Sequence, residues 1–237
     1  MLILAFDTTG PHGGAALYRG AASLGEARPS GKANYSVALF EMAGRLLAGC
    51  GQRLADVELF AAATGPGSFT GIRVGLAAAQ GWAGAFGRPV RGVSALEAMV
   101  EAAQPAAGIA VPVLDAHRGE LYFGVYRRAA ASGAGESAFA LSGEGGVMPP
   151  GGVVALVTAL AREAGVPVTV VAREQDAAAR ELAAGLGEAA CAVVPDFLAA
   201  SVAQAAWRAA REGRLQQPCE LDAWYIRRSD AELNWRG

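Results

Sequence analysis

The sequence of 237 residues is poor in the side chains on which most chemical functions depend. It contains two histidines and three cysteines, and its 20 Lys and Arg residues are balanced by 22 Asp and Glu residues. A net charge of −2 offers no positive surface for nucleic acid, so any RNA contact is expected to rely on another protein. Cys50, Cys191 and Cys219 are widely spaced and outside any CxxC pair, which argues against disulfides and zinc.

Long hydrophobic runs are also missing. No apolar run reaches the roughly 20 residues of a membrane span. The start of the chain, Met1–Phe6, lacks a basic n-region and runs directly into Asp7, unlike a signal peptide. Because 53% of the residues are hydrophobic, the chain can build a sizeable core. We therefore expect a soluble, cytoplasmic protein of one large domain or two small ones, with no membrane contact.

The most distinctive stretch is glycine-rich and runs from Gly65 to Gly75, with the sequence GPGSFTGIRVG. The apolar residues 57–63 before it predict a buried strand, and Ser68 or Thr70 can cap the helix that follows. Three interpretations stay open: an anion site at the helix N-terminus, a tight turn that lets the helix pack closely on a sheet, or a partner interface. The third rests on the almost bare helical stripe Gly71, Gly75 and Ala78. No lysine follows the glycines as in a P-loop.

The helix predicted for residues 34–48 has apolar residues on two sides. One stripe consists of Val37, Phe40, Gly44 and Leu47, and the other of Leu39, Met42 and Leu46. A helix on a domain surface needs only one apolar side, so this helix is either fully buried or meets a partner. The helix after Ser68 carries Trp82 and Phe86 beside its small residues and raises the same question. We favour a protein–protein surface made by the two helices together.

Two polar motifs are candidates for chemistry. Asp7, followed by two threonines and a glycine turn, resembles the first phosphate loop of the actin, Hsp70 and sugar-kinase fold. Asp7 could equally cap its own turn, and this structural interpretation is favoured. The densest cluster of ionisable side chains is Asp115, His117, Arg118 and Glu120. It falls in a predicted hairpin turn, where a solvated or turn-stabilising role is favoured over catalysis.

Two further segments are predicted from composition. Residues 129–151 are Gly-rich and loosely patterned, which predicts a domain boundary or a mobile segment. Residues 218–237 include Trp224 and Tyr225, and a tail this aromatic is expected to dock on the rest of the protein.

Four motifs occur in an order that resembles the TsaB (YeaZ) family of bacterial tRNA threonylcarbamoyladenosine biosynthesis proteins. They are Ile3–Thr9, Gly65–Gly75, Ser94–Ala98 and Asp115–Tyr122. The resemblance covers roughly the first half of the chain. His117 stands where the family usually has Arg, and Ala223-Trp224 stands where a Pro commonly precedes the Tyr.

The resemblance implies an α/β fold of the actin-like ATPase (ASKHA, ribonuclease H-like) type with two subdomains. The first, residues 1–105, would hold the dimerisation helices, and the second, residues 106–237, would be reduced and include a flexible Gly-rich segment, 129–151. The implied role is a non-catalytic scaffold or activator of the complex that adds threonylcarbamoyl to the tRNA adenosine next to the anticodon. Its partners would be a TsaD-like catalytic subunit and a TsaE-like ATPase, with a homodimer in the absence of TsaD and only indirect contact with tRNA.

The residues present agree with a role without catalysis. The catalytic paralogues hold a metal with an HxxxH pair, whereas this chain has only His12 and His117, far apart in sequence. We therefore expect no catalytic residue and no metal ligand. The alternative is a small actin-fold ATPase or kinase that uses Asp7 and the loop Gly65–Gly71.

The predicted sites are of two kinds. The predicted partner interface consists of Val37, Phe40, Gly44, Leu47, Gly71, Gly75, Ala78 and Trp82. Within it, Gly75→Leu is expected to abolish heterodimer formation. The vestigial or composite nucleotide site consists of Asp7, Thr8, Thr9, Gly67 and Ser68. The isolated chain is expected to bind no cofactor, and ATP or ADP could be held only at the junction of the complex.

Overall fold

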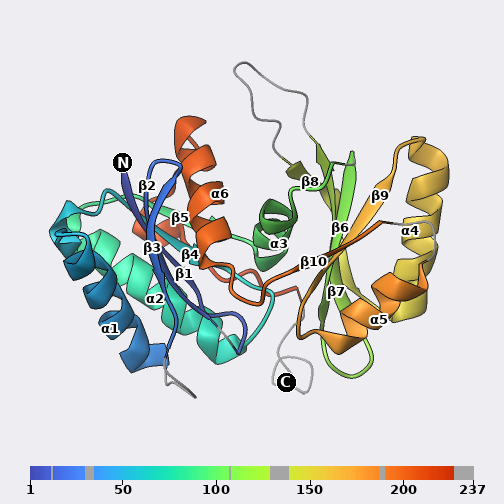
Figure 1. Cartoon of the computed structure of the whole chain (residues 1–237), viewed down its shortest axis with the longest axis horizontal. Helices are drawn as coiled ribbons and strands as arrows, with labels where there is room; N and C mark the ends of the chain where they lie inside the picture. The colour runs from blue at the N-terminus through green and yellow to red at the C-terminus, as the bar shows by residue number, and fades with distance from the viewer. Residues whose placement is uncertain (12, 30–34, 107, 129–138, 187–189, 227–237) are drawn as a thin grey trace, which may run out of the picture.

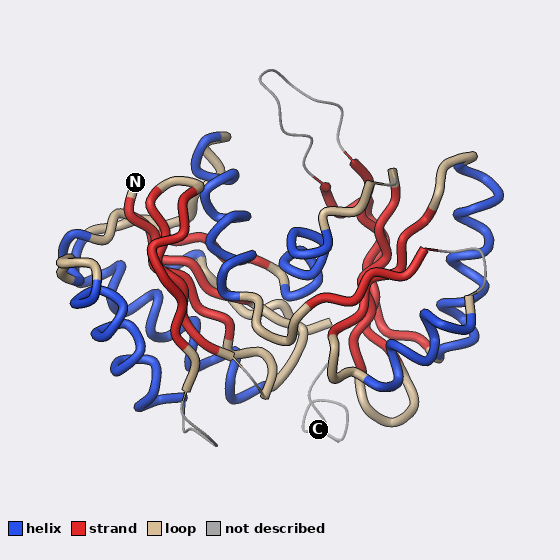
Figure 2. The backbone as a smooth tube through the Cα atoms, viewed as in Figure 1, coloured by secondary structure: helices blue, strands red, loops and turns tan. Residues whose placement is uncertain are grey.

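The structure is a computed structural model that describes residues 1–11, 13–29, 35–106, 108–128, 139–186 and 190–226. The chain forms two five-stranded sheets with helices on both faces of each (Figures 1 and 2). The first sheet has the order β3-β2-β1-β4-β5, and β1 pairs antiparallel with β2 and parallel with β4. Its strands are β1 (Leu2–Asp7), β2 (Gly14–Arg19), β3 (Ala22–Ala27), β4 (Leu59–Ala63) and β5 (Val90–Val93).

The second sheet repeats this plan with the order β10-β9-β6-β7-β8. Strands β6, β7 and β8 pair antiparallel, β9 pairs in parallel with β6, and β10 pairs in parallel with β9. The strands are β6 (Ile109–Asp115), β7 (Leu121–Arg128), β8 (Phe139–Met148), β9 (Val168–Arg173) and β10 (Ala190–Val194). In both sheets the central strand, β1 or β6, therefore lies between an antiparallel and a parallel neighbour.

The helices complete a layered molecule in which α1 and α2 cover the outer face of the first sheet and α4 and α5 the outer face of the second (Figure 1). Helices α3 and α6 lie between the two sheets and pack on one another. The α-helices described are α1 (Tyr35–Gly49), α2 (Phe69–Phe86), α3 (Ala95–Ala103), α4 (Pro150–Ala164), α5 (Ala177–Gly185) and α6 (Ala199–Arg211). Short 3-10 turns occupy Leu54–Asp56 and Pro218–Glu220.

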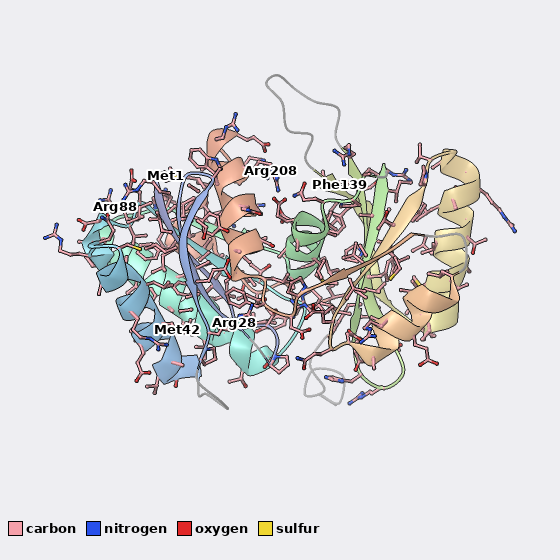
Figure 3. All side chains as sticks on the ribbon, in the orientation of Figure 1. Met1, Arg28, Met42, Arg88, Phe139 and Arg208 are labelled. Atoms are coloured by element: carbon pink, nitrogen blue, oxygen red, sulfur yellow. The ribbon has the colours of Figure 1, made fainter. Side chains whose placement is uncertain are left out.

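Side chains fill the spaces between these layers in three apolar cores (Figure 3). Phe6, Leu39 and Met42 belong to the core between the first sheet and α1–α2. The central core gathers around α3 and α6, and the third lies between the second sheet and α4–α5. No helix in the described ranges is long and apolar enough to cross a membrane.

The predicted division after residue 105 falls between the two sheets, but α6 packs against β1 and β2 of the first sheet. The subdomain bounds 1–105 and 106–237 thus stay a prediction. The interpretation of 129–151 as a boundary or mobile segment needs correction, because 139–148 form strand β8 and α4 begins at Pro150. This strand forms by pairing its backbone with β7, and a Gly-rich sequence carries no apolar pattern that would predict such pairing. Residues 129–138 lie outside the described residues.

Candidate functional site

The glycine-rich stretch forms a turn that ties β4 and α2 to the end of β1. Ser68 caps α2, because its hydroxyl accepts the Gly71 N–H at 3.2 Å. The Ser68 N–H donates to the Thr9 carbonyl at 2.7 Å. Gly67 has a φ of 151°, and a Cβ there would overlap the Thr9 carbonyl oxygen. Of the two predicted caps, Ser68 or Thr70, the structure selects Ser68.

The stripe of small residues on α2 packs against another part of the same chain, the end of β1. The Thr8 hydroxyl donates to the Gly71 carbonyl at 2.6 Å. A Cβ at Gly75 would come within 2.5 Å of that hydroxyl oxygen, and one at Gly71 would overlap the Thr8 carbonyl oxygen. Both glycines are buried against the end of β1. Gly71 and Gly75 therefore let the helix approach the sheet, and their assignment to a partner surface is corrected. Gly75→Leu would disturb this internal contact whether or not a partner exists.

Helix α1 buries one apolar side and exposes the other. Leu39, Met42 and Leu46 enter the core, as expected for the second stripe. Val37 and Phe40 are 58% and 57% exposed, and Gly44 is exposed as well. Leu47 was predicted on the partner side, but it is 5% exposed and belongs to the core, because it lies between the two stripes on the helical wheel.

The exposed side of α1 continues onto α2 through an aromatic cluster. The Phe40 ring meets the Trp82 ring edge-on, with centroids 5.1 Å apart. Trp82 also contacts the buried rings of Phe6 and Phe60, at 5.4 and 6.1 Å. Phe86, one turn after Trp82, is 37% exposed, and Ala78, one turn before it, is half-buried against the core. We call Val37, Phe40, Gly44, Trp82 and Phe86 the α1–α2 face.

A second candidate lies where the two sheets meet. The Asp7 carboxylate at the end of β1 accepts the Thr9 N–H at 2.9 Å and the Thr9 hydroxyl at 2.6 Å through Oδ1. Its Oδ2 faces Nη2 of Arg173, the last residue of β9, at 3.6 Å. The same Nη2 donates to the Thr9 hydroxyl oxygen at 3.3 Å. The side chains of Asp7 and Arg173 are only 1% and 6% exposed.

Each residue predicted for the nucleotide site thus has an internal role. Asp7 and Thr9 contact Arg173, Thr8 binds α2, and Gly67 and Ser68 pack on the Thr9 backbone. Sequence analysis did not find Arg173, which is the last residue of a mostly apolar strand and carries no motif.

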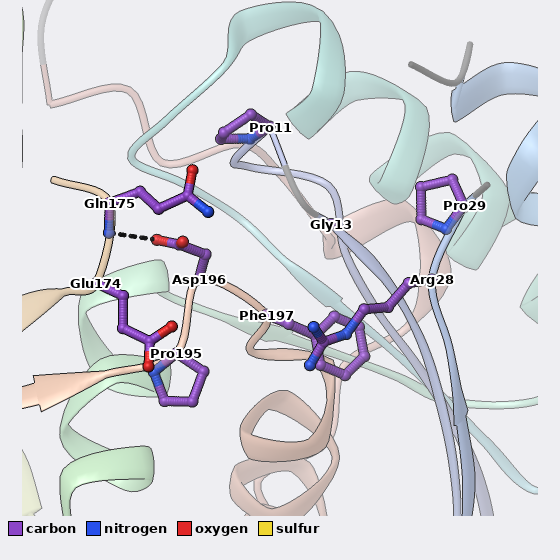
Figure 4. A pocket seen from close by; sticks show the side chains of 9 residues that line it. All are labelled: Pro11, Gly13, Arg28, Pro29, Glu174, Gln175, Pro195, Asp196 and Phe197. Atoms are coloured by element: carbon purple, nitrogen blue, oxygen red, sulfur yellow. Dashed lines mark hydrogen bonds between the residues drawn. The ribbon is translucent and has the colours of Figure 1, made fainter. Parts of the chain in front are cut away.

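A pocket of about 390 Å³ is lined in part by residues that follow β1 and β9, among them Pro11 and Glu174 (Figure 4). The Arg28 guanidinium lies over the Phe197 ring, 4.5 Å from its centroid. Asp196 accepts the Gln175 N–H at 3.3 Å, and Glu174 lies on the same wall. The lining residues are Pro11, Gly13, Arg28, Pro29, Glu174, Gln175, Pro195, Asp196 and Phe197. Two carboxylates against one guanidinium make this lining unsuited to a polyphosphate.

The cluster around residue 117 stabilises a turn. The Asp115 carboxylate accepts the His117 N–H at 2.7 Å, and the His117 side chain is 86% exposed. Asp176 accepts both the Asp115 N–H at 2.6 Å and the N–H of Ala179, so the β6–β7 hairpin is tied to the start of α5. Within the described ranges, no three His, Cys, Asp or Glu side chains are placed to hold a metal ion. His12 lies outside the described residues.

The C-terminal segment docks along α2, as far as it is described. The Trp224 N–H donates to the Thr64 carbonyl at 2.8 Å, and Arg73 Nε donates to the Tyr225 hydroxyl at 3.1 Å. The Arg73 guanidinium also covers the Phe69 ring at 3.7 Å. The expectation of a docked aromatic tail is confirmed up to residue 226.

Charged side chains also occupy the junction of α3 and α6. Glu101 forms a two-pronged ion pair with Arg208. Glu97 lies 3.7 Å from Arg91, and burial raises the pKa of the Glu97 carboxyl despite that neighbour. Burial likewise raises the pKa of Tyr126, whose hydroxyl is bonded to Ser94. These contacts join α3 to α6, to β5 and to β7.

Comparisons with known proteins agree on one family. The model of the family described as TsaD, tRNA N6-adenosine threonylcarbamoyltransferase, matches residues 30–221. The tRNA threonylcarbamoyladenosine biosynthesis protein TsaB of Bacillus subtilis is 35% identical over 127 residues, 54% of this chain and 56% of that protein. Escherichia coli TsaB is 37% identical over 92 residues, 38% of this chain and 40% of that protein. The chain thus spans about half the length of the curated relatives it matches.

Solved structures extend the likeness to the whole fold. YeaZ from Pseudomonas aeruginosa superimposes with a TM-score of 0.72 at 24% identity, over 95% of this chain and 99% of that one. Together with the two observed sheets, this likeness confirms the predicted α/β fold.

Proposed function

Because this chain belongs to the TsaD-type family and, within it, to the TsaB (YeaZ) group, we propose that it acts in the biosynthesis of threonylcarbamoyladenosine in tRNA. Its role is that of a non-catalytic scaffold and activator in the cytoplasm. It pairs with a TsaD-like subunit that carries the transfer chemistry, supports binding of a TsaE-like ATPase, and meets tRNA only through these partners. Without the TsaD-like subunit, the same surface joins two copies of this chain.

The observation that carries this proposal is the α1–α2 face. Val37 and Phe40 are each more than half exposed, although a surface helix of a monomer gains nothing by exposing them. Phe40 rests on Trp82, whose other contacts reach the core, so the exposed ring has a rigid base. Aromatic anchors on a rigid base are typical of the centre of a protein interface.

The chemistry of the rest of the chain supports a role without catalysis. Ser68 caps helix α2, and Asp115 stabilises the turn of the β6–β7 hairpin. Among the described residues, no group of three His, Cys, Asp or Glu side chains could hold a metal ion. The alternative, an ATPase or kinase using Asp7 and the loop Gly65–Gly71, loses support because both make internal contacts. The acidic net charge agrees with an indirect role towards tRNA.

The test is size-exclusion chromatography with light scattering, on this chain alone and with the TsaD-like subunit of the same source. Phe40→Glu places a charge at the proposed centre and is expected to lower the affinity of the heterodimer at least about a hundredfold, because an unpaired buried charge is costly. Val154→Glu is the matched control: Val154 is 39% exposed on α4, at the far side of the molecule.

Two results would count against the proposal. A folded Phe40→Glu variant that pairs as well as the natural chain would remove the α1–α2 face from the interface. Loss of pairing in Val154→Glu alone would move the interface to the second sheet. Circular dichroism of both variants separates lost pairing from lost folding.

A further inference from the structure

The actin-like fold class implies a metal-bound phosphate at the end of the first strand, and the residues of this chain do not fit that group. The place is filled by a guanidinium. Arg173 Nη2 lies 3.6 Å from Asp7 Oδ2 and 3.3 Å from the Thr9 hydroxyl oxygen. A Cβ on Gly10 would come within 2.7 Å of Nη1, so the guanidinium also lies against the backbone of the turn.

The charge balance of this buried pair leaves no role for a second cation. Asp7 Oδ1 takes both bonds from Thr9, whereas Oδ2 accepts no hydrogen bond from any described residue and faces the guanidinium. A carboxylate that is 99% buried needs a compensating positive charge nearby. Arg173 supplies it, and a divalent cation at Oδ2 would be repelled by the same guanidinium.

The pair also connects the two sheets. Asp7 is the last residue of β1 in the first sheet, and Arg173 is the last residue of β9 in the second. Ligands of open α/β sheets bind at the carboxyl ends of the strands, which is where this ion pair lies.

We infer that Arg173 is a built-in counterion that takes the place of a metal-bound nucleotide at Asp7 and fixes the two sheets to one another without any cofactor. The ion pair, rather than a bound nucleotide, then sets how the ends of β1 and β9 lie relative to one another. This inference goes beyond the proposed function, since α1–α2 lie on the outer face of the first sheet and do not contain either residue.

A double-mutant cycle on the isolated chain tests the pairing. Asp7→Asn keeps an acceptor for Thr9 but loses the charge, and Arg173→Met replaces the buried guanidinium by an apolar chain of similar length. Each single variant leaves one buried charge unpaired and is expected to raise the unfolding equilibrium constant, measured in urea, by about a hundredfold. The double variant removes both charges and is expected to lose no more than the larger single loss.

The control is Arg180→Met, an exposed arginine on neighbouring α5 that bonds only the Glu174 carbonyl among the contacts described for its guanidinium. It is expected to leave the unfolding equilibrium within about threefold of the natural chain. Losses of Asp7→Asn and Arg173→Met that simply add in the double variant would overturn the inference. If Arg173→Met fails to fold while the double variant folds, the coupling is established.

A second measurement does not depend on folded variants of Arg173. Isothermal titration of the natural isolated chain with ATP and Mg²⁺ is expected to show no binding. Saturable binding that Asp7→Asn abolishes would overturn the inference, because it would place a nucleotide where the guanidinium lies. Neither measurement involves a partner protein. A result that contradicts the partner interface can therefore be distinguished from one that contradicts the role of Arg173.

Discussion

Because α2 approaches β1 closely, replacing a glycine of α2 by alanine is predicted to stabilise the protein at one position and to destabilise it at another. Alanine is the better helix former by about 1 kcal/mol, so Gly→Ala normally stabilises a helix. Gly81 has open space around it, with nothing within 4 Å of an added Cβ, and Gly81→Ala should gain about that amount. Gly71 faces the Thr8 carbonyl oxygen, which an added Cβ would overlap.

The cost at Gly71 has two parts. Helix α2 must move away from β1, which in a packed core costs about 1–3 kcal/mol. The movement also stretches the buried bond from the Thr8 hydroxyl to the Gly71 carbonyl, now 2.6 Å, which contributes about 1 kcal/mol. After the helix-propensity gain is subtracted, Gly71→Ala should destabilise the protein by about 2 kcal/mol.

Urea unfolding followed by circular dichroism at one protein concentration measures both variants. The difference in unfolding free energy between them should be about 3 kcal/mol, or roughly 6–12 °C in midpoint temperature for a chain of this size. If Gly71→Ala is as stable as Gly81→Ala, then α2 does not need its glycines to reach β1. The bare stripe would then again be available for a partner.

Two further predictions concern single polar groups. Ser68→Ala removes the cap of α2 and should cost about 1 kcal/mol. Ser68→Asp keeps an acceptor for the Gly71 N–H and should retain most of the stability in the same urea assay. Equal losses in both variants would show that the cap contributes nothing. Burial raises the pKa of Glu97, so the folded state is stabilised while the carboxyl is protonated and loses that advantage as pH rises through the folded pKa. Glu97→Gln should therefore gain stability over the natural chain at pH 7 and gain less at pH 4, and a difference independent of pH would contradict this reasoning.

Local patterns identified most elements of the fold. The helix predicted at 34–48 is observed at Tyr35–Gly49, and the strand predicted at 57–63 is observed at Leu59–Ala63. Both have a clear apolar pattern bounded by glycine or polar residues, and such signals are local. Strand β8 was missed because its support comes from pairing with β7, which composition does not reveal.

The candidate sites were predicted less completely, and for a physical reason. A helical stripe without side chains, such as Gly71 and Gly75, predicts that another backbone packs closely against the helix. It does not indicate whether that backbone belongs to a strand of the same chain or to another protein. Phe40 could be assigned only once the buried side of α1 was known. Arg173 could not be predicted at all, because its contact Thr9 lies 164 residues away in the sequence.

The repeated sheet plan sharpens this point, since it places an aspartate at the end of both central strands, Asp7 on β1 and Asp115 on β6. Each accepts the backbone N–H two residues on, at 2.9 and 2.7 Å, so the local chemistry of the two turns is the same. Their surroundings differ: Asp7 is buried against Arg173, while the Asp115 side chain is 43% exposed beside His117. An aspartate after an apolar strand therefore predicts a turn, whereas its burial and the charge that faces it, Arg173 in the case of Asp7, depend on the other sheet.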